Sequence, residues 1–226
     1  MKYHHIIKAT FLSRPNRFIA RVAIDGAEET VHVKNTGRCR ELLKPGATVY
    51  LERAANPDRK TKYDLVAVVK DTGVLFNIDS QAPNAAVKEW LEGQDFDRVQ
   101  PEYRYGNSRI DFYMERARER FLMEVKGCTL EFDGIGYFPD APTERGTKHL
   151  RELTRAVREG YRAIAAFVIQ MAGVEEVRPN EETDPAFARA FEEAREAGVE
   201  ILFLKCRVEP DEMIITDGSA VPRLLP

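Results

Sequence analysis

The chain is 226 residues long, 43% of them apolar and 31% charged, with a formal net charge of −3. This size and apolar content allow two modest hydrophobic cores, whereas the lack of any apolar run near ~20 residues excludes a transmembrane helix. The start of the chain does not lead into a signal-peptide core, so we expect a cytoplasmic protein that binds no membrane.

Charge is spread unevenly along the chain. Residues 1–70 hold fourteen Lys or Arg against seven Asp or Glu, whereas residues 175–200 hold three bases against nine acids. Phosphate contacts supply most of the non-specific affinity for nucleic acid, so the basic part is the expected binding surface. The acidic part, with apolar Phe187, Ala190, Phe191 and Ala194, predicts an amphipathic helix with a solvated acidic face.

Short strands broken by turn residues are predicted in the first 80 residues, at 18–24, 30–33, 48–51, 63–69 and 74–78. Strands of this length and spacing are typical of a small β-barrel. Basic side chains in or beside its turns are the candidates for phosphate contacts: Arg14, Arg17, Arg38, Arg59 and Lys60. The alternative is that these bases only make the surface soluble.

From about residue 83 the pattern changes to alternating helices and strands. We predict a helix at 85–91, a hairpin, a strand that ends near Lys126, and a helix from Thr143 or Thr147 to about Glu159. A strand at 163–170, the acidic helix and a last strand at 201–207 follow. Such alternation predicts an α/β sandwich around a mixed sheet.

The most informative residues lie on two of these strands. Asp111 is in an apolar run at 110–114, and Glu124 and Lys126 end another at 121–125. Residues two apart on a strand face the same side, so Glu124 and Lys126 meet there while Met123 and Val125 face the opposite layer. Two carboxylates and an amine suit a metal-dependent nuclease, with Mg²⁺ or Mn²⁺ on Asp111 and Glu124 and a water positioned by Lys126. The alternative is a surface ion pair.

A third acid depends on the hairpin register. If Gly106-Asn107 forms a two-residue turn, Tyr105 pairs with Ser108 and Glu102 lies opposite Asp111. Facing carboxylates repel unless a cation or a proton lies between them. Glu102 is therefore expected to assist catalysis.

The helix after Thr143 carries a second set of candidate phosphate contacts, namely Arg145, Lys148 and His149. Arg145 and His149 fall near the helix start, where free backbone N–H groups favour an anion. The cysteines give no comparable signal: Cys39, Cys128 and Cys206 lie far apart without a Cys-x-x-Cys pair, so we expect them reduced and buried.

Sequence blocks shared with one known family run through the whole chain. They are Asn16-Arg17-Phe18, Asn35-Thr36-Gly37-Arg38, Glu41-Leu42-Leu43-x-Pro45-Gly46, Arg59-Lys60-Thr61, Pro83-Asn84, Ser108-Arg109-Ile110-Asp111-Phe112, Glu124-Val125-Lys126, residues 138–153, Asp184-Pro185 and Ala197-Gly198-Val199. On these blocks the chain resembles the sugar fermentation stimulation protein (SfsA) family, although Gly127 stands where we expect Asn.

The resemblance implies an OB-like barrel over residues 1–82 and a PD-(D/E)xK nuclease-like α/β domain over 83–226. It also implies DNA binding with little sequence preference. Two hypotheses follow: a metal-dependent nuclease, and a noncatalytic DNA-binding protein with a regulatory role in sugar metabolism. Strand preference and oligomeric state stay open at this stage.

Overall fold

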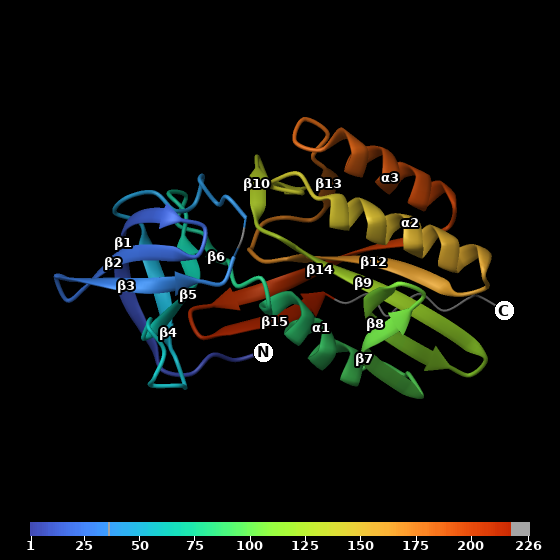
Figure 1. The fold of residues 1–226 in the computed structure, drawn as a ribbon, viewed down its shortest axis with the longest axis horizontal. Coiled ribbons are helices and arrows are strands. Elements are labelled where there is room, and N and C mark those ends of the chain that lie inside the picture. Colours follow the sequence, from blue (N-terminus) through green and yellow to red (C-terminus); the bar gives the residue numbers. More distant parts are fainter. Residues whose placement is uncertain (36, 218–226) are drawn as a thin grey trace.

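The computed structural model describes residues 1–35 and 37–217, so Thr36 of the Asn35–Arg38 block lies outside the described residues. A β-barrel and an α/β domain lie side by side along the long axis of the molecule (Figure 1). The N-terminal residues run between them, because Met1 donates to the carbonyl of Met213 and its ammonium group pairs with Glu89 at 2.7 Å.

The N-terminal domain has six strands: β1 (Ile6–Asn16), β2 (Ile19–Ile24), β3 (Ala27–Val33), β4 (Thr48–Arg53), β5 (Tyr63–Val69) and β6 (Leu75–Asn77). They lie in the order β3-β2-β1-β4-β5-β6, and a parallel pairing of β3 with β5 closes β1 to β5 into a five-stranded barrel, with β6 added beside β5. Alternate side chains such as Phe11, Val22 and Leu51 fill the interior at 0–1% exposure, as the period of two requires. The barrel is the expected OB architecture.

The first strand, β1, was not predicted from the sequence. Its register against β2 shifts between Phe11 and Ser13 and again between Ser13 and Asn16. Such bulges break the alternation of apolar and polar residues that identifies a strand. The other barrel strands were predicted to within a few residues.

The C-terminal domain is built on a mixed sheet of six strands, in the order β15-β14-β12-β9-β8-β7. The strands are β7 (Arg98–Tyr105), β8 (Ser108–Arg116), β9 (Glu119–Cys128), β12 (Arg162–Ile169), β14 (Glu200–Glu209) and β15 (Glu212–Asp217). The strand β12 runs parallel to both β9 and β14, and the other pairs are antiparallel. The predicted fold class is therefore confirmed, although β15 was not predicted.

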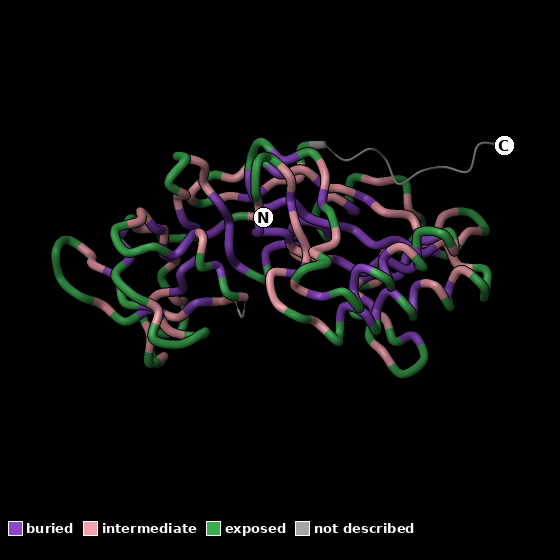
Figure 2. The backbone as a smooth tube through the Cα atoms, turned by 90° about the horizontal axis from the view of Figure 1, so that it is seen from above, coloured by how far each residue is buried: buried purple, intermediate pink, exposed green. Residues whose placement is uncertain are grey.

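Helices cover both faces of this sheet (Figure 1): α1 (Ala82–Glu92), α2 (Glu144–Arg158) and α3 (Pro185–Glu196). On one face α1 packs Val87 and Leu91 into a core with Met114 and Phe121. On the other face the residues of α2 and α3 join a separate core. The buried segments in Figure 2 accordingly concentrate along the strands and the inner faces of the helices.

Side-chain caps define where two of the helices begin. The hydroxyl of Thr143 accepts from Gly146 N at 3.0 Å, so α2 begins there and not at Thr147. Asp184 caps α3 in the same way by accepting from Phe187 N at 2.9 Å. Such caps satisfy backbone donors that a helix start otherwise leaves unpaired.

A small third sheet, β10-β11-β13, connects the two domains. Its strands β10 (Leu130–Phe132), β11 (Ile135–Phe138) and β13 (Val177–Pro179) were not predicted. Lys70 of the barrel pairs with Glu131 of β10 at 2.5 Å. This sheet therefore helps to hold the barrel against the C-terminal domain.

Gln170 makes an extensive polar contact between the domains. Its Nε2 donates to the carbonyls of Asn77 and Asp79 and to Asn77 Oδ1, at 3.0–3.2 Å. A Cβ on Gly127 would lie 2.3 Å from Gln170 Oε1. A larger residue at this position would therefore require the Gln170 side chain to move.

Two further expectations concern membrane spans and cysteine chemistry. Within the described part of the chain, no helix is long and apolar enough to cross a membrane. Cys39, Cys128 and Cys206 are free and buried, as predicted. Burial raises the pKa of each thiol to about 12, so these side chains are unreactive packing residues.

Candidate functional site

Asp111 ties together three elements of the C-terminal domain. The ladder between β8 and β9 ends at the pair Phe112 and Met123. Beyond it, Asp111 Oδ2 accepts from the backbone N–H of Val125 at 2.8 Å, and Oδ1 accepts from Asn84 of α1, also at 2.8 Å. The carboxylate is thus fixed at the point where the two strands separate.

Glu124 and Lys126 share one face of β9, as the strand period predicted. Lys126 Nζ donates to Glu124 Oε1 at 2.7 Å. Met123 and Val125, which alternate with them, belong instead to the core under α1. The predicted meeting of an acid and an amine over one patch is therefore present.

His149 of α2 lies behind these residues. It is 4% exposed and its Nδ1 contacts Glu124 Oε1, while Arg145 Nε donates to its Nε2 at 3.4 Å. The contact with Arg145 favours the ring tautomer that carries its proton on Nδ1, which faces Glu124 Oε1 and also lies 3.3 Å from Lys126 Nζ. His149 was predicted to contact phosphate; the structure places it as a buried support for the Glu124 carboxylate.

The two carboxylates are in different electrostatic states. Burial, and next the charge of Glu124, raise the pKa of Asp111 above its usual value. Burial acts the same way on Glu124, but the charge of Lys126 and the His149 hydrogen bond outweigh it and lower the Glu124 pKa. Lys126 and His149 therefore favour ionisation of Glu124, and the charge of Glu124 in turn disfavours ionisation of Asp111.

One oxygen of this pair is unsatisfied. Glu124 Oε2 is buried and has no hydrogen-bond partner among the described residues. A buried carboxylate oxygen without a donor or cation is costly. Asp111 and Glu124 line one cleft of about 400 Å³ together with Ser80, Gln81, Asn84, Glu102, Val125, Lys126 and Arg145, which we call the carboxylate cleft.

The donor set of the carboxylate cleft fits a hard divalent cation. Over residues 1–35 and 37–217, no three His, Cys, Asp or Glu side chains are grouped as metal ligands. A cation such as Mg²⁺ commonly takes one or two protein carboxylates and completes its shell with water and phosphate. The unsatisfied Glu124 oxygen and the neighbouring Asp111 carboxylate agree with that mode.

Glu102 lies in the predicted register but has another partner. The pairs Pro101–Phe112 and Tyr103–Ile110 bracket it, and Tyr105 pairs with Ser108 as expected. Its backbone has φ of 55°, and its carboxylate contacts Arg109 Nε at 2.5 Å. Glu102 therefore lines the cleft with its charge neutralised by Arg109, and its assisting role stays a prediction.

Exposed bases flank the cleft on α2. Arg145 is exposed and lines the cleft itself, whereas the exposed Lys148 lies 3.8 Å from Glu152. Of the three phosphate contacts predicted on this helix, Arg145 is the one that is exposed and lines the cleft, whereas His149 is buried against Glu124.

A second hollow, of about 440 Å³, is rich in arginine and lies between the barrel and Ala141. We call it the arginine groove; its lining includes Arg14, Arg17, Arg38 and Arg40. Arg14 donates to the carbonyls of Arg17, Asn35, Gly37 and Arg38 at 2.6–2.9 Å, so it braces the loops instead of facing phosphate. Arg17, Arg38 and Arg40 are exposed. Arg40 was missed, although it follows Arg38 at the two-residue spacing.

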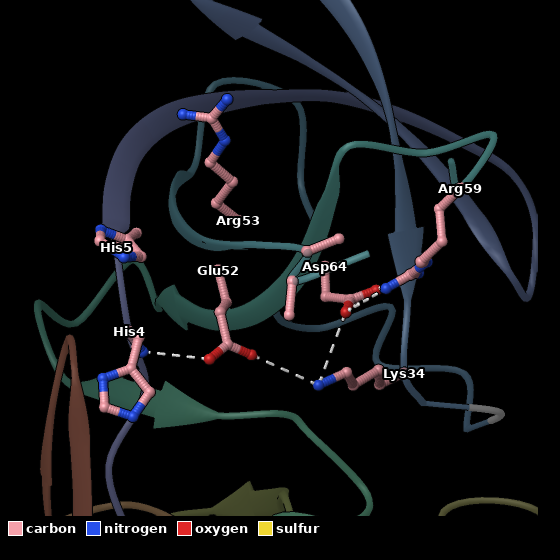
Figure 3. A pocket seen from close by; sticks show the side chains of 9 residues that line it. His4, His5, Lys34, Glu52, Arg53, Arg59 and Asp64 are labelled. Atoms are coloured by element: carbon pink, nitrogen blue, oxygen red, sulfur yellow. Dashed lines mark hydrogen bonds and ion pairs between the residues drawn. The ribbon is translucent and has the colours of Figure 1, made fainter. Parts of the chain in front are cut away.

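Arg59 and Lys60 lie elsewhere, on the loop between β4 and β5. Arg59 lines a hollow of about 740 Å³ with His4, His5, Lys34, Glu52, Arg53, Ala54, Ala55 and Asp64, which we call the barrel cavity (Figure 3). Its guanidinium group binds both oxygens of Asp64, at 2.9 and 2.7 Å. The predicted phosphate contact of Arg59 is therefore already occupied by a carboxylate, while Lys60 is exposed.

The structure combines an OB barrel with a mixed α/β sheet that carries two carboxylates and a lysine on adjacent strands. Two family models match its two parts. The model described as the SfsA N-terminal OB domain matches residues 12–78, and that described as the sugar fermentation stimulation protein RE domain matches residues 81–212. The chain belongs to the sugar fermentation stimulation protein family.

Relatives agree with this assignment over nearly the full length. A sugar fermentation stimulation protein homolog from Desulfitobacterium hafniense (strain DSM 10664 / DCB-2) is 52% identical over 98% of both chains. One from Clostridium beijerinckii is 52% identical over 96% of this chain and 97% of its own. The structure of Pyrococcus furiosus SfsA in complex with Ca²⁺ matches with a TM-score of 0.84 and 32% identity, covering 95% of this chain and 94% of that one.

Proposed function

We propose that this protein binds DNA without sequence preference and hydrolyses its phosphodiester bonds with Mg²⁺ or Mn²⁺ held by Asp111 and Glu124. One observation carries the proposal. A buried, partnerless oxygen of Glu124 lies in the same cleft as a second carboxylate whose pKa is raised, and neither feature stabilises the metal-free fold.

Each residue of the cleft has a role in this proposal. A bound divalent cation lowers the pKa of a water and offsets charge on the phosphate. Asn84 and the Val125 N–H orient the Asp111 carboxylate, and His149 orients Glu124. Lys126 holds the attacking water and stabilises charge that develops on the phosphate. Arg145, which also lines the cleft, holds a neighbouring phosphate.

Two comparisons support the proposal. The OB domain is a scaffold that commonly binds nucleic acid through its loops and one face. The relative from Pyrococcus furiosus is in complex with Ca²⁺, a hard cation that takes oxygen ligands as Mg²⁺ does.

The test is a nicking assay on supercoiled and linear DNA with Mn²⁺, Mg²⁺ or EDTA, for the wild type and Asp111→Asn. We expect metal-dependent cleavage that the substitution abolishes, while metal-free DNA affinity changes less than about threefold. Lys126→Ala should also abolish cleavage but keep metal affinity in a calorimetric titration. A purified wild type that binds DNA yet never cuts single-stranded, duplex or branched substrates contradicts the catalytic half of the proposal.

A second function is favoured by a specific feature of the same cleft. Lys126 already neutralises Glu124 at 2.7 Å, and the described residues supply no third metal-binding acid. These contacts suit a noncatalytic DNA-binding protein with a regulatory role in sugar metabolism. Calorimetry separates the two functions, because only the nuclease requires Mg²⁺ or Mn²⁺ to bind in a manner that Asp111→Asn removes.

A further inference from the structure

Three hollows of the molecule are neighbours. The arginine groove shares Gly37 with a pocket between the domains, which also includes Tyr137, Asp140 and Gln170. That interdomain pocket in turn shares Ser80, Val125 and Lys126 with the carboxylate cleft. The three hollows therefore follow one another from the arginines to the proposed cleavage site.

The interdomain pocket is the smallest of the three hollows. The interdomain pocket encloses about 220 Å³, against about 440 Å³ for the arginine groove and 400 Å³ for the carboxylate cleft. A Cβ on Gly37 would lie 2.3 Å from Asp140 Oδ2, so these two residues approach closely where the interdomain pocket meets the arginine groove.

Unpaired cations line the arginine groove. No acidic side chain among the described residues forms an ion pair with Arg17, Arg38 or Arg40. Arg14 braces the backbone of the loops that carry these arginines, through four hydrogen bonds to carbonyls. The arrangement is a prepared anion site, because the cations are held in place without being neutralised.

An aromatic ring stands beside these arginines. Phe18 is 47% exposed, and the Arg17 guanidinium lies 5.0 Å from its ring centroid. Asn16 Oδ1 accepts from the backbone N–H groups of Phe18 and Ile19, which fixes the turn that carries the ring. A rigid exposed aromatic among cations is typical of single-strand binding, since an unpaired base can stack on it and a paired base cannot.

We propose that the substrate strand is single-stranded DNA, which stacks a base on Phe18, places phosphates on Arg17, Arg38 and Arg40, and passes through the interdomain pocket to the carboxylate cleft. This inference rests on the proposed function, because it names the substrate of the same site. In this inference Phe18 is a DNA-binding residue, and the carboxylates keep the catalytic role of the proposed function.

The test is fluorescence anisotropy in EDTA, with a labelled mixed-sequence strand of about 20 nucleotides and the duplex of the same sequence. The single strand should bind at least about tenfold more tightly than the duplex. Phe18→Ala should weaken single-strand binding about tenfold without changing the salt slope, because the substitution leaves the phosphate contacts in place. Phe18→Tyr keeps a stacking face and should bind like the wild type.

Phe132→Ala is the matched control. Phe132 is also exposed, at 53%, but it lies on β10 with its ring centroid 6.0 Å from that of Tyr137, whereas the Phe18 ring lies beside Arg17. Its replacement should leave single-strand affinity unchanged. Equal affinity for duplex and single strand, or identical behaviour of Phe18→Ala and Phe132→Ala, overturns the inference.

The two proposals fail in different ways. Single-strand binding through Phe18 without any cleavage in Mn²⁺ refutes the nuclease and leaves the strand path standing. Duplex cleavage that is indifferent to Phe18→Ala refutes the strand path and leaves the nuclease standing. The absence of binding to either form of DNA refutes both.

Discussion

The barrel cavity and the carboxylate cleft both contain buried acids. Only in the barrel cavity is each lining acid paired with a cationic side chain. In the barrel cavity, Asp64 is 3% exposed and is bound by Arg59, His32 and Lys34. Figure 3 shows the same pattern for Glu52, which joins His4 and Lys34. The side chains hold one another in place there and require no further ligand.

The carboxylate cleft is the smaller of the two, at about 400 Å³ against about 740 Å³, yet three acids line it against two bases, and Asp111 has no cation as a partner among the described residues. Asp111 lies close enough to Glu124 for the Glu124 charge to raise its pKa, and one Glu124 oxygen is without a partner. The comparison therefore separates the two hollows by charge pairing and not by size. Buried oxygens of Glu41, Glu152 and Glu200 also have no partner among the described residues, so the feature that marks the cleft is an unsatisfied oxygen beside a second carboxylate whose pKa is raised.

The largest expected effect is on the rate of DNA cleavage, which should depend on the carboxylate cleft and not on the barrel cavity. Glu124→Gln should reduce the rate of Mn²⁺-dependent DNA cleavage by about 10³-fold, because it removes a charge that binds the cation and the transition state. Glu52→Gln changes the same type of side chain in the barrel cavity and should leave the rate within about twofold. Equal reductions in the two variants would show that the assay reports folding, and a full rate for Glu124→Gln would remove Glu124 from the site.

Metal-linked stability should distinguish the same regions. If Mn²⁺ binds the native cleft, a hundredfold excess over Kd raises the free energy of unfolding by about 2.7 kcal/mol. Thermal melts with and without Mn²⁺ should show this gain in the wild type and in Asp64→Asn, but not in Asp111→Asn. A gain that persists in Asp111→Asn would place the cation elsewhere.

The ion-pair network of the barrel cavity should contribute to stability and not to cleavage. Asp64 has its pKa lowered because Arg59, His32 and Lys34 outweigh the effect of burial. Asp64→Asn should therefore cost about 2 kcal/mol of unfolding free energy at neutral pH. A depressed carboxylate contributes its full stability above the unfolded pKa of about 4, and that contribution disappears as the pH falls through the folded pKa.

Denaturant titrations at neutral pH and near pH 3 measure this difference. It should shrink at the lower pH, because near pH 3 the Asp64 carboxylate of the unfolded wild type is largely protonated and part of its contribution to stability is lost. Asp71→Asn is the control: Asp71 is exposed and pairs only with the exposed Lys44, so its replacement should leave the unfolding midpoint unchanged. A wild-type advantage that persists unchanged near pH 3 would show that the Asp64 charge is not its source.

Much of the fold could be predicted because local sequence patterns indicate it. The alternation on β9 predicted which side of the strand Glu124 and Lys126 share, and the turn at Gly106 predicted the register of β7 with β8. The short strand β13 could not be predicted in this way, because it is stabilised by pairing with β11, about 40 residues away in the chain, which no local pattern shows. The hairpin of β10 and β11 was missed, although the Asp133-Gly134 turn between them is a local signal.

The positions of Asp111 and Glu124 were predictable from strand parity, but the state of each basic side chain was not. Arg59 and His149 look like free cations or ligands in the sequence. The structure pairs the first with Asp64 and buries the second against Glu124. Both partners depend on how loops and helices pack on the sheet, so the number of bases in the sequence overestimates those available to DNA.

The smallest expected effect tests this distinction between free and paired arginines. Removing one phosphate contact reduces the slope of log affinity against log salt by about one. Arg38→Ala should show that reduction in single-strand binding, because its side chain is exposed in the arginine groove. Arg59→Ala should keep the wild-type slope, because the guanidinium it removes is committed to Asp64. Titrations at several salt concentrations, well below the melting temperature of each variant, measure both slopes. An equal reduction in Arg59→Ala would mean that the Asp64 pair opens when DNA binds, and the barrel cavity would then belong to the binding surface.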